Sequence, residues 1–360
     1  MMGSFGLLAL LFGGLAIAGL GGGGGDDGSD SPASQNRDGD ASDDTMTGGD
    51  GNDTLNGMGG EDLIAGRGGN DMLFGGDDDD KLLGEAGDDE LHGGEGNDRL
   101  FGDNEDLSLA DGAGNDKLYG EGGDDVLFGR DGADELYGGA GVDTLKGENG
   151  KDTLYGGDDG DTLEGGGGWD NLYGGEGDDG LDGGFGNDVL IGGLGDDSMQ
   201  GGGGDDIIFG LEGGFASVTG SEGAITLTGF TGTEANATVD GTTSAPGLVG
   251  NEGDDTLYLG NGDIAEGGAD SDTFVLGSWL NGSAVAQVMD FGGAVTAPGA
   301  AESDVLQVMH DGSLTAANLA VTVTPGGTAE VSIDGTLVAT LIGKGAAALS
   351  VSDIQLVTAS

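Results

Sequence analysis

The stretch Gly48-Gly49-Asp50-Gly51-Asn52-Asp53-Thr54-Leu55-Asn56 begins a nine-residue pattern that continues in phase to Phe209. All eighteen consecutive units carry a large aliphatic residue at position eight. Position six is aspartate in every unit except Gly102–Ala110, where Leu107 takes its place. A period this strict indicates a solenoid, in which each unit forms one structural element and packs mainly against its neighbours.

The spacing predicts how one unit folds. Three residues around position eight can form a short strand with its central side chain inward. The preceding Gly-Gly-x-Gly-x-Asp can form a turn, because glycine permits backbone angles that other residues avoid. Two units then complete one coil, and eighteen units give nine coils over roughly 40 Å. We therefore predict an all-β fold: a parallel β-roll (a β-solenoid of nonapeptide repeats) followed by a small C-terminal β-domain.

The composition indicates a metal held by oxygen. Asp and Glu number 68 against nine Lys and Arg, which gives a formal net charge of −59. Such a chain excludes nucleic acid as a direct partner, because phosphate contacts need clustered basic residues. The chain has no cysteine and only two histidines, His92 and His310, so a hard ion is favoured. Its 88 glycines have no Gly-X-Y period, which excludes collagen.

Stacked coils would place the position-six aspartates in two columns, with like charges ~4.8 Å apart. Bare carboxylates at this distance repel, whereas Ca²⁺ accepts about six to eight carboxylate and carbonyl oxygens. Mg²⁺ fits less well because it requires a tighter octahedron and retains its waters. We predict several Ca²⁺ ions along the turns, with poor binding at Leu107. The predicted ligands are Asp53, Asp62, Asp71, Asp80, Asp89, Asp98, Asp116, Asp125, Asp134, Asp143, Asp152, Asp161, Asp170, Asp179, Asp188, Asp197 and Asp206.

The repeat resembles the RTX (repeats-in-toxin, haemolysin-type) calcium-binding family, whose pattern is Gly-Gly-x-Gly-x-Asp-x-aliphatic-x. The degenerate units Gly250–Leu257 and Gly267–Phe274 continue the resemblance, and Asp255 and Asp272 match the calcium aspartates of the family. In that family the repeats are disordered without calcium and fold outside the cell, which the resemblance implies here. The alternative is a flexible acidic linker, but a linker has no reason to keep an aliphatic residue at every ninth position.

Position nine points outward, and consecutive units alternate between the faces, so we expect two different outer surfaces. One series is Ala65, Leu83, Phe101, Tyr119, Tyr137, Tyr155, Tyr173, Ile191 and Phe209. The other is Asn56, Phe74, His92, Ala110, Phe128, Lys146, Glu164, Asp182 and Gln200. The first is an aromatic ladder, and we expect Lys81, Arg99 and Lys117 on its face. An exposed aromatic stripe indicates a partner: the C-terminal domain, another roll or a glycan. Alternatively, the rings only strengthen neighbouring strands.

We divide the chain into five regions. These are an apolar segment (1–20), a Gly/Asp/Ser-rich linker (21–47), the roll (48–209), a β-rich insertion (210–249), and degenerate repeats with a C-terminal β-domain (250–360). The apolar run is short for a membrane span and lacks a positive n-region, so it is an anchoring or export segment or an apolar tail. In the C-terminal region Asp334-Gly335 predicts a hairpin turn.

From Asp152 onward the only basic residue is Lys344. The resemblance implies that this acidic C-terminus with a terminal apolar stretch is an uncleaved type I secretion signal. A hydrophobic last strand is the alternative reading.

The sequence offers no catalytic motif. It contains no His-Glu-x-x-His and no Gly-x-Ser-x-Gly, and pairs such as Asp88-Asp89 recur with the repeat and so belong to turns. We predict a non-enzymatic, secreted or cell-surface calcium-binding protein that the type I secretion machinery exports. Its partners would be calcium ions and a glycan or surface partner on Phe101, Tyr119, Tyr137, Tyr155 and Tyr173. The alternative is a polysaccharide-binding or accessory module for an extracellular enzyme.

Overall fold

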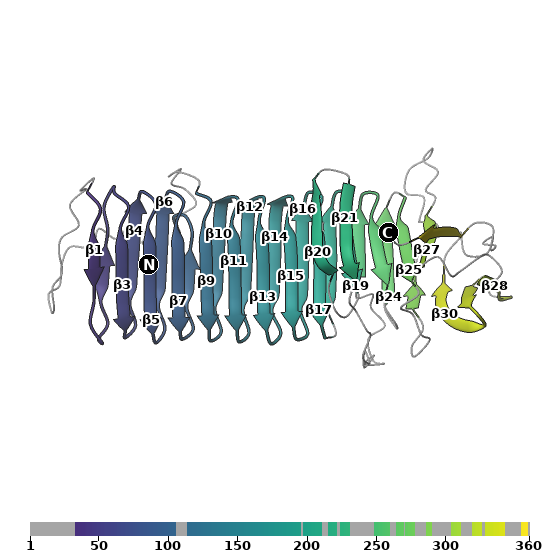
Figure 1. The fold of residues 1–360 in the computed structure, drawn as a ribbon, viewed down its shortest axis with the longest axis horizontal. Coiled ribbons are helices and arrows are strands. Elements are labelled where there is room, and N and C mark those ends of the chain that lie inside the picture. Colours follow the sequence, from purple (N-terminus) through teal and green to yellow (C-terminus); the bar gives the residue numbers. More distant parts are fainter. Residues whose placement is uncertain are drawn as a thin grey trace, which may run out of the picture.

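A computed structural model describes residues 33–105, 114–195, 197–210, 215–221, 224–230, 248–259, 264–269, 271–277, 286–289, 304–310, 319–325, 328–342 and 354–358. Most of these residues form one long solenoid, whose strands lie side by side and run across the long axis of the molecule (Figure 1). No helix occurs among them, so none is present that could cross a membrane. The predicted all-β parallel roll is confirmed. The apolar run before residue 33 lies outside the described residues.

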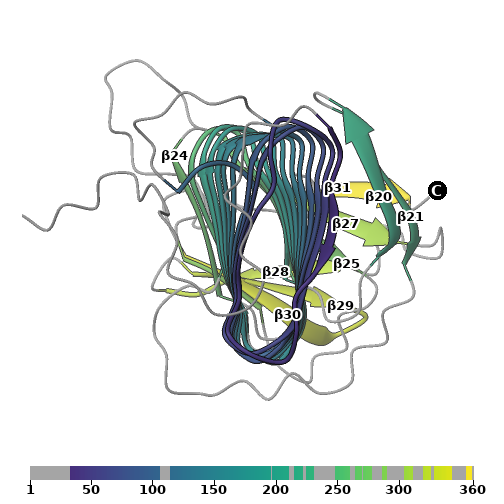
Figure 2. The same cartoon turned by 90° about the vertical axis from the view of Figure 1, so that its left-hand side faces the viewer.

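Two opposed parallel sheets form the walls of the roll, and Figure 2 shows them end-on. Sheet A contains β1 (Asn36–Asp38), β3 (Thr54–Gly59), β5 (Met72–Asp77), β7 (Glu90–Glu95), β9 (Lys117–Gly122), β11 (Glu135–Ala140), β13 (Thr153–Asp158), β15 (Asn171–Glu176), β17 (Val189–Leu194), β19 (Ile207–Gly210), β23 (Thr256–Leu259), β25 (Thr273–Gly277), β27 (Val305–His310) and β31 (Gln355–Thr358). Sheet B contains β2 (Thr45–Thr47), β4 (Leu63–Gly68), β6 (Lys81–Ala86), β8 (Arg99–Phe101), β10 (Val126–Gly132), β12 (Thr144–Gly150), β14 (Thr162–Gly168), β16 (Gly180–Phe185), β18 (Ser198–Gly203), β22 (Leu248–Glu252), β24 (Ile264–Ala269), β26 (Ala286–Val288) and β30 (Thr336–Leu341), followed by the antiparallel β29 (Ala329–Ile333) and β28 (Leu319–Val323).

A typical strand is longer than the three residues that the spacing predicts. It runs from position seven of one unit to position three of the next, as in β11. The backbone bends at position two, where φ is positive: 120° at Gly139 in β11, and 89° at Arg130 in β10. Only glycine adopts such angles without strain, which explains why position two is so often glycine. The turn is therefore shorter than the six-residue turn that the spacing predicts, and it comprises only positions four to six.

The core is the row of position-eight side chains between the two sheets. Every described member from Leu55 to Ile208 is between 0% and 3% exposed. Each packs on the equivalent residue of the next coil, for example Leu136 on Leu154. The core is only one aliphatic layer from each sheet, so each coil is stabilised through its neighbours. The inward placement of position eight is therefore confirmed.

One unit breaks the predicted alternation. Tyr119 pairs with His92, and Phe128 pairs with Phe101, so the register step is 27 residues instead of 18. β9 therefore pairs directly with β7, and β10 with β8, and the described part of the unit Gly102–Ala110, residues 102–105, forms no strand. We call Gly102–Ala110 the extra unit. The prediction of nine coils in unbroken alternation is wrong at this point. Leu107 itself lies outside the described residues.

The extra unit exchanges the faces of everything that follows it. The outer face of sheet A carries Asn56, Phe74, His92, Tyr119, Tyr137, Tyr155, Tyr173, Ile191 and Phe209. The outer face of sheet B carries Ala65, Leu83, Phe101, Phe128, Lys146, Glu164, Asp182 and Gln200. Phe101, Lys81 and Arg99 therefore lie opposite the tyrosines, which corrects the predicted ladder.

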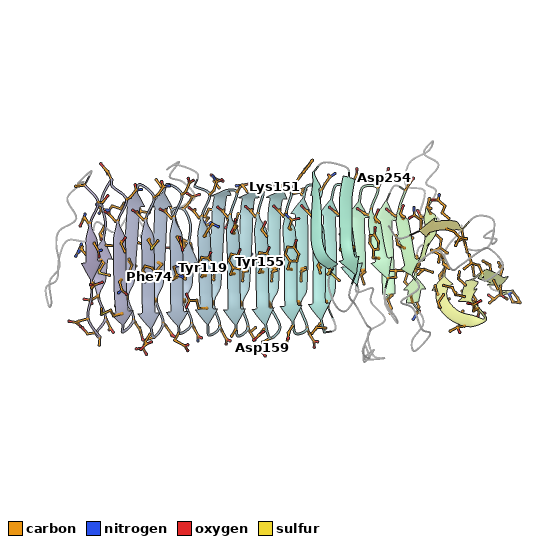
Figure 3. The ribbon with its side chains drawn as sticks, viewed as in Figure 1. Phe74, Tyr119, Lys151, Tyr155, Asp159 and Asp254 are labelled. Atoms are coloured by element: carbon orange, nitrogen blue, oxygen red, sulfur yellow. The ribbon has the colours of Figure 1, made fainter. Side chains whose placement is uncertain are left out.

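The rings of sheet A stack face to face. Centroid distances are 4.9 Å for Phe74–His92, 4.7 Å for His92–Tyr119, and 4.8–4.9 Å for the successive tyrosine pairs up to Tyr173. We call these six rings, Phe74 to Tyr173, the aromatic ladder. Figure 3 shows Phe74, Tyr119 and Tyr155 in one row on this face.

On sheet B the start of the extra unit is held against the outer face. Phe101 stacks on Phe128 at 4.9 Å, and the Arg130 guanidinium lies 5.1 Å from the Phe128 centroid. Arg130 pairs with Glu148 at 2.9 Å and donates to the Glu105 carbonyl oxygen at 3.5 Å. These contacts leave Phe101 only 1% exposed.

The ends of the roll also extend the predicted limits. Strands β1 and β2 pair in parallel with β3 and β4, so the coil begins within the predicted linker 21–47. The degenerate repeats join the same two sheets, and β29 and β30 form the hairpin predicted at Asp334-Gly335. Between β19 and β22 the strands β20 (Phe215–Ser221) and β21 (Ala224–Phe230) form an antiparallel hairpin beside sheet A (Figures 1 and 2).

Candidate metal centre

The position-six aspartates lie at the two edges of the roll, each at the end of a turn and directly before a strand. Column A precedes the strands of sheet A and consists of Asp53, Asp71, Asp89, Asp116, Asp134, Asp152, Asp170, Asp188, Asp206, Asp255 and Asp272. Column B precedes those of sheet B and consists of Asp62, Asp80, Asp98, Asp125, Asp143, Asp161, Asp179 and Asp197. In Figure 3, Lys151 and Asp254 mark the edge of column A, and Asp159 marks that of column B. All predicted ligands are thus placed in two lines.

One carboxylate oxygen of each aspartate ties two coils together. From Asp53 to Asp188, the N–H of each position-six aspartate donates to Oδ1 of the next aspartate in its column, at 2.7–3.0 Å. The ladder crosses the extra unit directly, from Asp89 to Asp116 and from Asp98 to Asp125. The aspartate is therefore a structural cross-link between coils as well as a candidate ligand.

The second carboxylate oxygen has no such partner. In every position-six aspartate from Asp62 to Asp188, and in Asp206, Oδ2 is buried and accepts no hydrogen bond. These residues are at most 3% exposed. A buried ionised oxygen without a donor or cation is costly, so a series of them indicates carboxyls that are either protonated or able to bind a cation.

The glycine at position one creates the space for this oxygen. A Cβ on Gly57 would lie 2.0 Å from Asp62 Oδ2 and 2.7 Å from the carbonyl oxygen of Gly75 in the next coil. Both distances are far below van der Waals contact, so any larger residue would displace the carboxylate. Close approach therefore fixes position one as glycine. The same turn brings carboxylate and carbonyl oxygens together.

Burial raises the pKa of these carboxyls strongly. The backbone N–H that each accepts lowers the pKa, while neighbouring carboxylates in most cases raise it further. The pKa rises from 3.8 to about 8 for Asp89, Asp116, Asp134 and Asp206. It rises to about 7 for Asp71, Asp80, Asp98, Asp143, Asp152, Asp161 and Asp170. The columns thus resist carrying a full negative charge without a counter-ion.

The oxygen atoms of the turns suit a hard cation, but the side chains alone do not supply enough ligands. Among the described residues, no group of three or more His, Cys, Asp or Glu side chains converges as a metal site. A bound ion would therefore need backbone carbonyl oxygens as well as position-six carboxylates. Calcium accepts such a mixture, because it tolerates about six to eight oxygens in irregular geometry. The assignment of individual aspartates as ligands stays a prediction.

The structure adds three aspartates that the repeat count missed. The N–H of Asp44 donates to Asp62 Oδ1 at 2.7 Å, and Asp272 donates to Asp304 at 3.3 Å, so both columns run further than predicted. Asp103, in the extra unit, is 5% exposed and accepts from Asp131 N–H at 3.0 Å and Gly114 N–H at 3.3 Å. Gly39, Asp44 and Met46 occupy positions one, six and eight of a further repeat unit, so the sequence could have revealed Asp44. Asp103 does not occupy position six, and no such pattern marks it.

A second, outer ladder follows position five. The side-chain oxygen of Asn97 accepts from Asp124 N–H at 2.8 Å, and that of Asp124 accepts from Val142 N–H at 2.9 Å. On the other edge Asn115 accepts from Ala133 N–H at 2.9 Å. This ladder runs in the opposite direction to that of position six. It explains the frequent Asn and Asp at position five.

Comparison with protein families identifies these turns. The model of the RTX calcium-binding nonapeptide repeat, in copies of four, matches residues 38–73, 74–106, 111–145, 146–181, 182–214 and 248–274. The unmatched gaps fall within the extra unit and around the β20–β21 hairpin. No similar protein was found among curated sequences. The matched ranges cover more than half of the chain, and their repeats bind Ca²⁺ at multiple sites. This protein therefore belongs to the RTX calcium-binding repeat family.

Proposed function

We propose that this chain is an exported, non-enzymatic protein whose roll folds when calcium binds outside the cell. The observation that carries the proposal is the series of buried, unpartnered Oδ2 atoms along both columns. Folding buries these carboxylates, so a cation that binds only the folded state stabilises it by mass action. Calcium is scarce inside cells and abundant outside, which would keep the chain unfolded until export.

The residues that would hold calcium are the predicted aspartates of columns A and B, Asp255 and Asp272 included. When bound, calcium supplies positive charge and oxygen coordination at the turns. The chain itself positions the ligands: position-one glycines give the carboxylates room, and Oδ1 hydrogen bonds fix their direction. Asp103 would add a carboxylate at the extra unit, next to Asp89, Asp116 and Asp134.

Export is supported by composition. The C-terminal half is acidic and contains a single basic residue, Lys344, which fits type I secretion in this family. Lys344 lies outside the described residues. We propose a secreted or cell-surface location on the same ground. A structural or surface-interaction role is favoured because the sequence contains neither His-Glu-x-x-His nor Gly-x-Ser-x-Gly.

A polysaccharide-binding role is the second candidate, and the aromatic ladder is the observation behind it. Sugars stack on the flat faces of aromatic rings. In the ladder each inner ring is covered on both faces by its neighbours, at 4.7–4.9 Å, so a glycan would meet mostly ring edges. The stacking therefore favours the structural reading, in which the rings stabilise adjacent strands.

A calcium titration followed by far-UV circular dichroism tests the proposal. We expect residues 33–360 to give a coil spectrum in chelator at neutral pH and a β-rich spectrum with calcium, through a steep midpoint. Magnesium at the same concentration should be much less effective. A spectrum that does not respond to calcium would refute the proposal. A glycan array, run with calcium and with chelator, separates a scaffold from a carbohydrate binder.

A further inference from the structure

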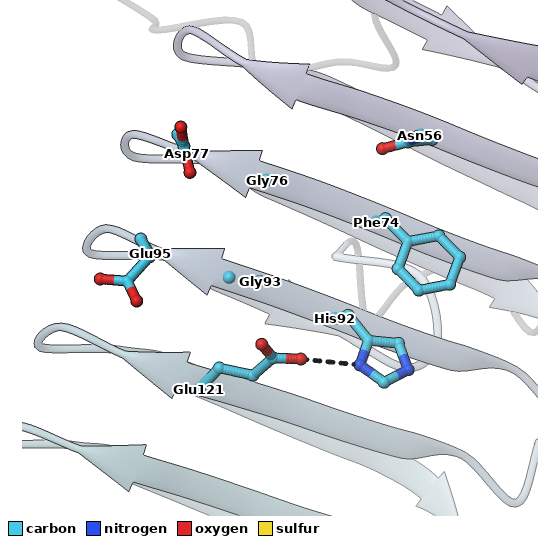
Figure 4. Close-up of a pocket in the computed structure, with 9 residues that line it drawn as sticks. Asn56, Phe74, Gly76, Asp77, His92, Gly93, Glu95 and Glu121 are labelled. Carbon is cyan, nitrogen blue, oxygen red and sulfur yellow. Dashed lines mark hydrogen bonds and ion pairs between the residues drawn. The ribbon is translucent and has the colours of Figure 1, made fainter.

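A shallow pocket of about 450 Å³ opens on the outer face of sheet A, at the N-terminal end of the aromatic ladder. It spans strands β3, β5, β7 and β9. Figure 4 shows its walls. The lining residues are Asn56, Phe74, Gly76, Asp77, His92, Gly93, Gly94, Glu95 and Glu121.

The repeat itself explains why the hollow exists. Positions one and two are both glycine in the two central units, so Gly76 and Gly94 leave a floor without side chains between β5 and β7. One wall consists of the position-nine rings, and the other consists of the position-three carboxylates Asp77 and Glu95, which are neighbours across β5 and β7. Along a strand the two walls are three residues apart, which is about 10 Å.

Phe74 is the first ring of the ladder and is half-buried. His92 covers one side of it, at 4.9 Å between centroids. The neighbour on the other side is Asn56, which pairs with Phe74 in register and has no ring. No ring therefore covers the Phe74 face toward Asn56, whereas Tyr119, Tyr137 and Tyr155 each have rings on both sides. The alkyl stems of Lys and Arg pack on apolar surfaces such as this ring, while their charged ends lie among polar groups.

The charges of the pocket are negative. No Lys or Arg lines it. The carboxylates of Asp77 and Glu95 are exposed, and neither forms a salt bridge with any residue that the structure describes. His92 is held between Glu121, at 2.9 Å, and Glu90, at 3.1 Å, so its ring nitrogens face carboxylates and not the pocket's acidic wall. A basic side chain entering the pocket could place its cation at the two carboxylates of one wall and its apolar stem against the Phe74 ring of the other.

We propose that this pocket binds a guanidinium or ammonium group, carried by a basic peptide side chain or by a small organic amine. The hollow is long enough for an alkyl stem between the rings and the acidic wall. A bare metal ion is a poorer fit, because no three side-chain ligands converge there. A sugar would use the ring but would gain nothing from two unneutralised carboxylates.

The test uses the full chain in saturating calcium, after circular dichroism has shown that it is folded. Failure to fold is thus separated from failure to bind. The probe is N-acetyl-arginine methylamide, measured by ligand-detected NMR at physiological salt. Its neutral isostere, N-acetyl-citrulline methylamide, is the matched control. We expect arginine to bind with a dissociation constant on the order of 1 mM, and citrulline to bind at least about tenfold more weakly. Agmatine, which lacks peptide groups, shows whether the cation alone suffices.

Matched variants locate the binding. Asp77→Asn with Glu95→Gln should weaken arginine binding about fivefold, and Phe74→Asn, which copies Asn56 and removes the apolar contact with the stem, about threefold. Asp158→Asn with Glu176→Gln removes an equivalent carboxylate pair beside Tyr155 and should change nothing. Equal binding of citrulline, no detectable binding, or equal loss in the Asp158/Glu176 variant would overturn the proposal. Preferential binding of a neutral oligosaccharide would overturn it in favour of a glycan site.

Discussion

Removing calcium and varying the pH tests whether the buried aspartates control folding. In the folded roll, burial raises the pKa of Asp134 to about 8, against 3.8 for an ordinary aspartate. Because the folded pKa exceeds the unfolded one, the folded state binds protons more tightly. The stabilisation that these protonated aspartates give the metal-free roll is therefore fully present below about pH 4. It is lost progressively as the pH rises through 7 to 8.

The free energy of ionising the buried aspartates is large enough to decide whether the metal-free roll folds. A pKa raised from 3.8 to about 7, as for Asp152, means that ionising the carboxyl in the fold costs about 4 kcal/mol more than in the unfolded chain. Relaxation and water penetration reduce this figure. If only about a quarter of it remains, the eleven aspartates with a pKa of about 7 or 8 still oppose folding by about 10 kcal/mol. That equals the whole stability of a typical domain.

Metal-stripped protein should therefore show a β-rich far-UV spectrum at pH 5 and a coil spectrum at pH 8. Both conditions lie above the isoelectric point of about 4.1, which limits precipitation. Calcium at pH 8 should restore the β-rich spectrum, whereas an equal ionic strength of potassium chloride should not. Rescue by potassium chloride would assign the effect to exposed charges, which salt screens. A β-rich spectrum at pH 8 without metal, or a coil spectrum at pH 5, would refute the reasoning.

Three further changes test the site, the core and the extra unit. Asp134→Asn should stabilise the metal-free roll at pH 8, because the amide cannot ionise. The same change should raise the calcium concentration needed for half-folding, because the amide is a weaker ligand. The control Asp159→Asn, at an exposed turn, should have neither effect. Leu136→Ala removes a fully buried side chain and should cost about 2–5 kcal/mol in chemical denaturation with calcium, whereas Leu194→Ala, at a site 48% exposed, should cost less than about 0.5 kcal/mol. Deletion of residues 103–111 leaves Gly-Gly-Ala-Gly-Asn-Asp at the junction, a complete repeat turn, so the β-rich spectrum and the near-UV tyrosine signal should persist; their loss would contradict the register described above.

Much of the roll could be predicted from the sequence because its determinants are local. An aliphatic residue at position eight must face inward once the strand and turn repeat, and Leu136 and its equivalents do so. The aspartates at position six fall into columns for the same reason. What the pattern did not contain was the direction of each hydrogen bond. Neither the Oδ1 bond to the preceding coil nor the position-five ladder follows from spacing, since both depend on how the turn backbone is rotated.

The two faces could not be predicted, for a reason of parity. One coil uses two units, so the sheet to which a strand belongs depends on how many strand-forming units precede it. The extra unit is one period long and keeps both a glycine at position one and a leucine at position eight, so the phase of the repeat does not reveal it. Adding one unit without a strand exchanges the sheets of all later strands. That exchange places Tyr119 on His92 and extends the ladder to Phe74, whose exposed face then borders the acidic pocket.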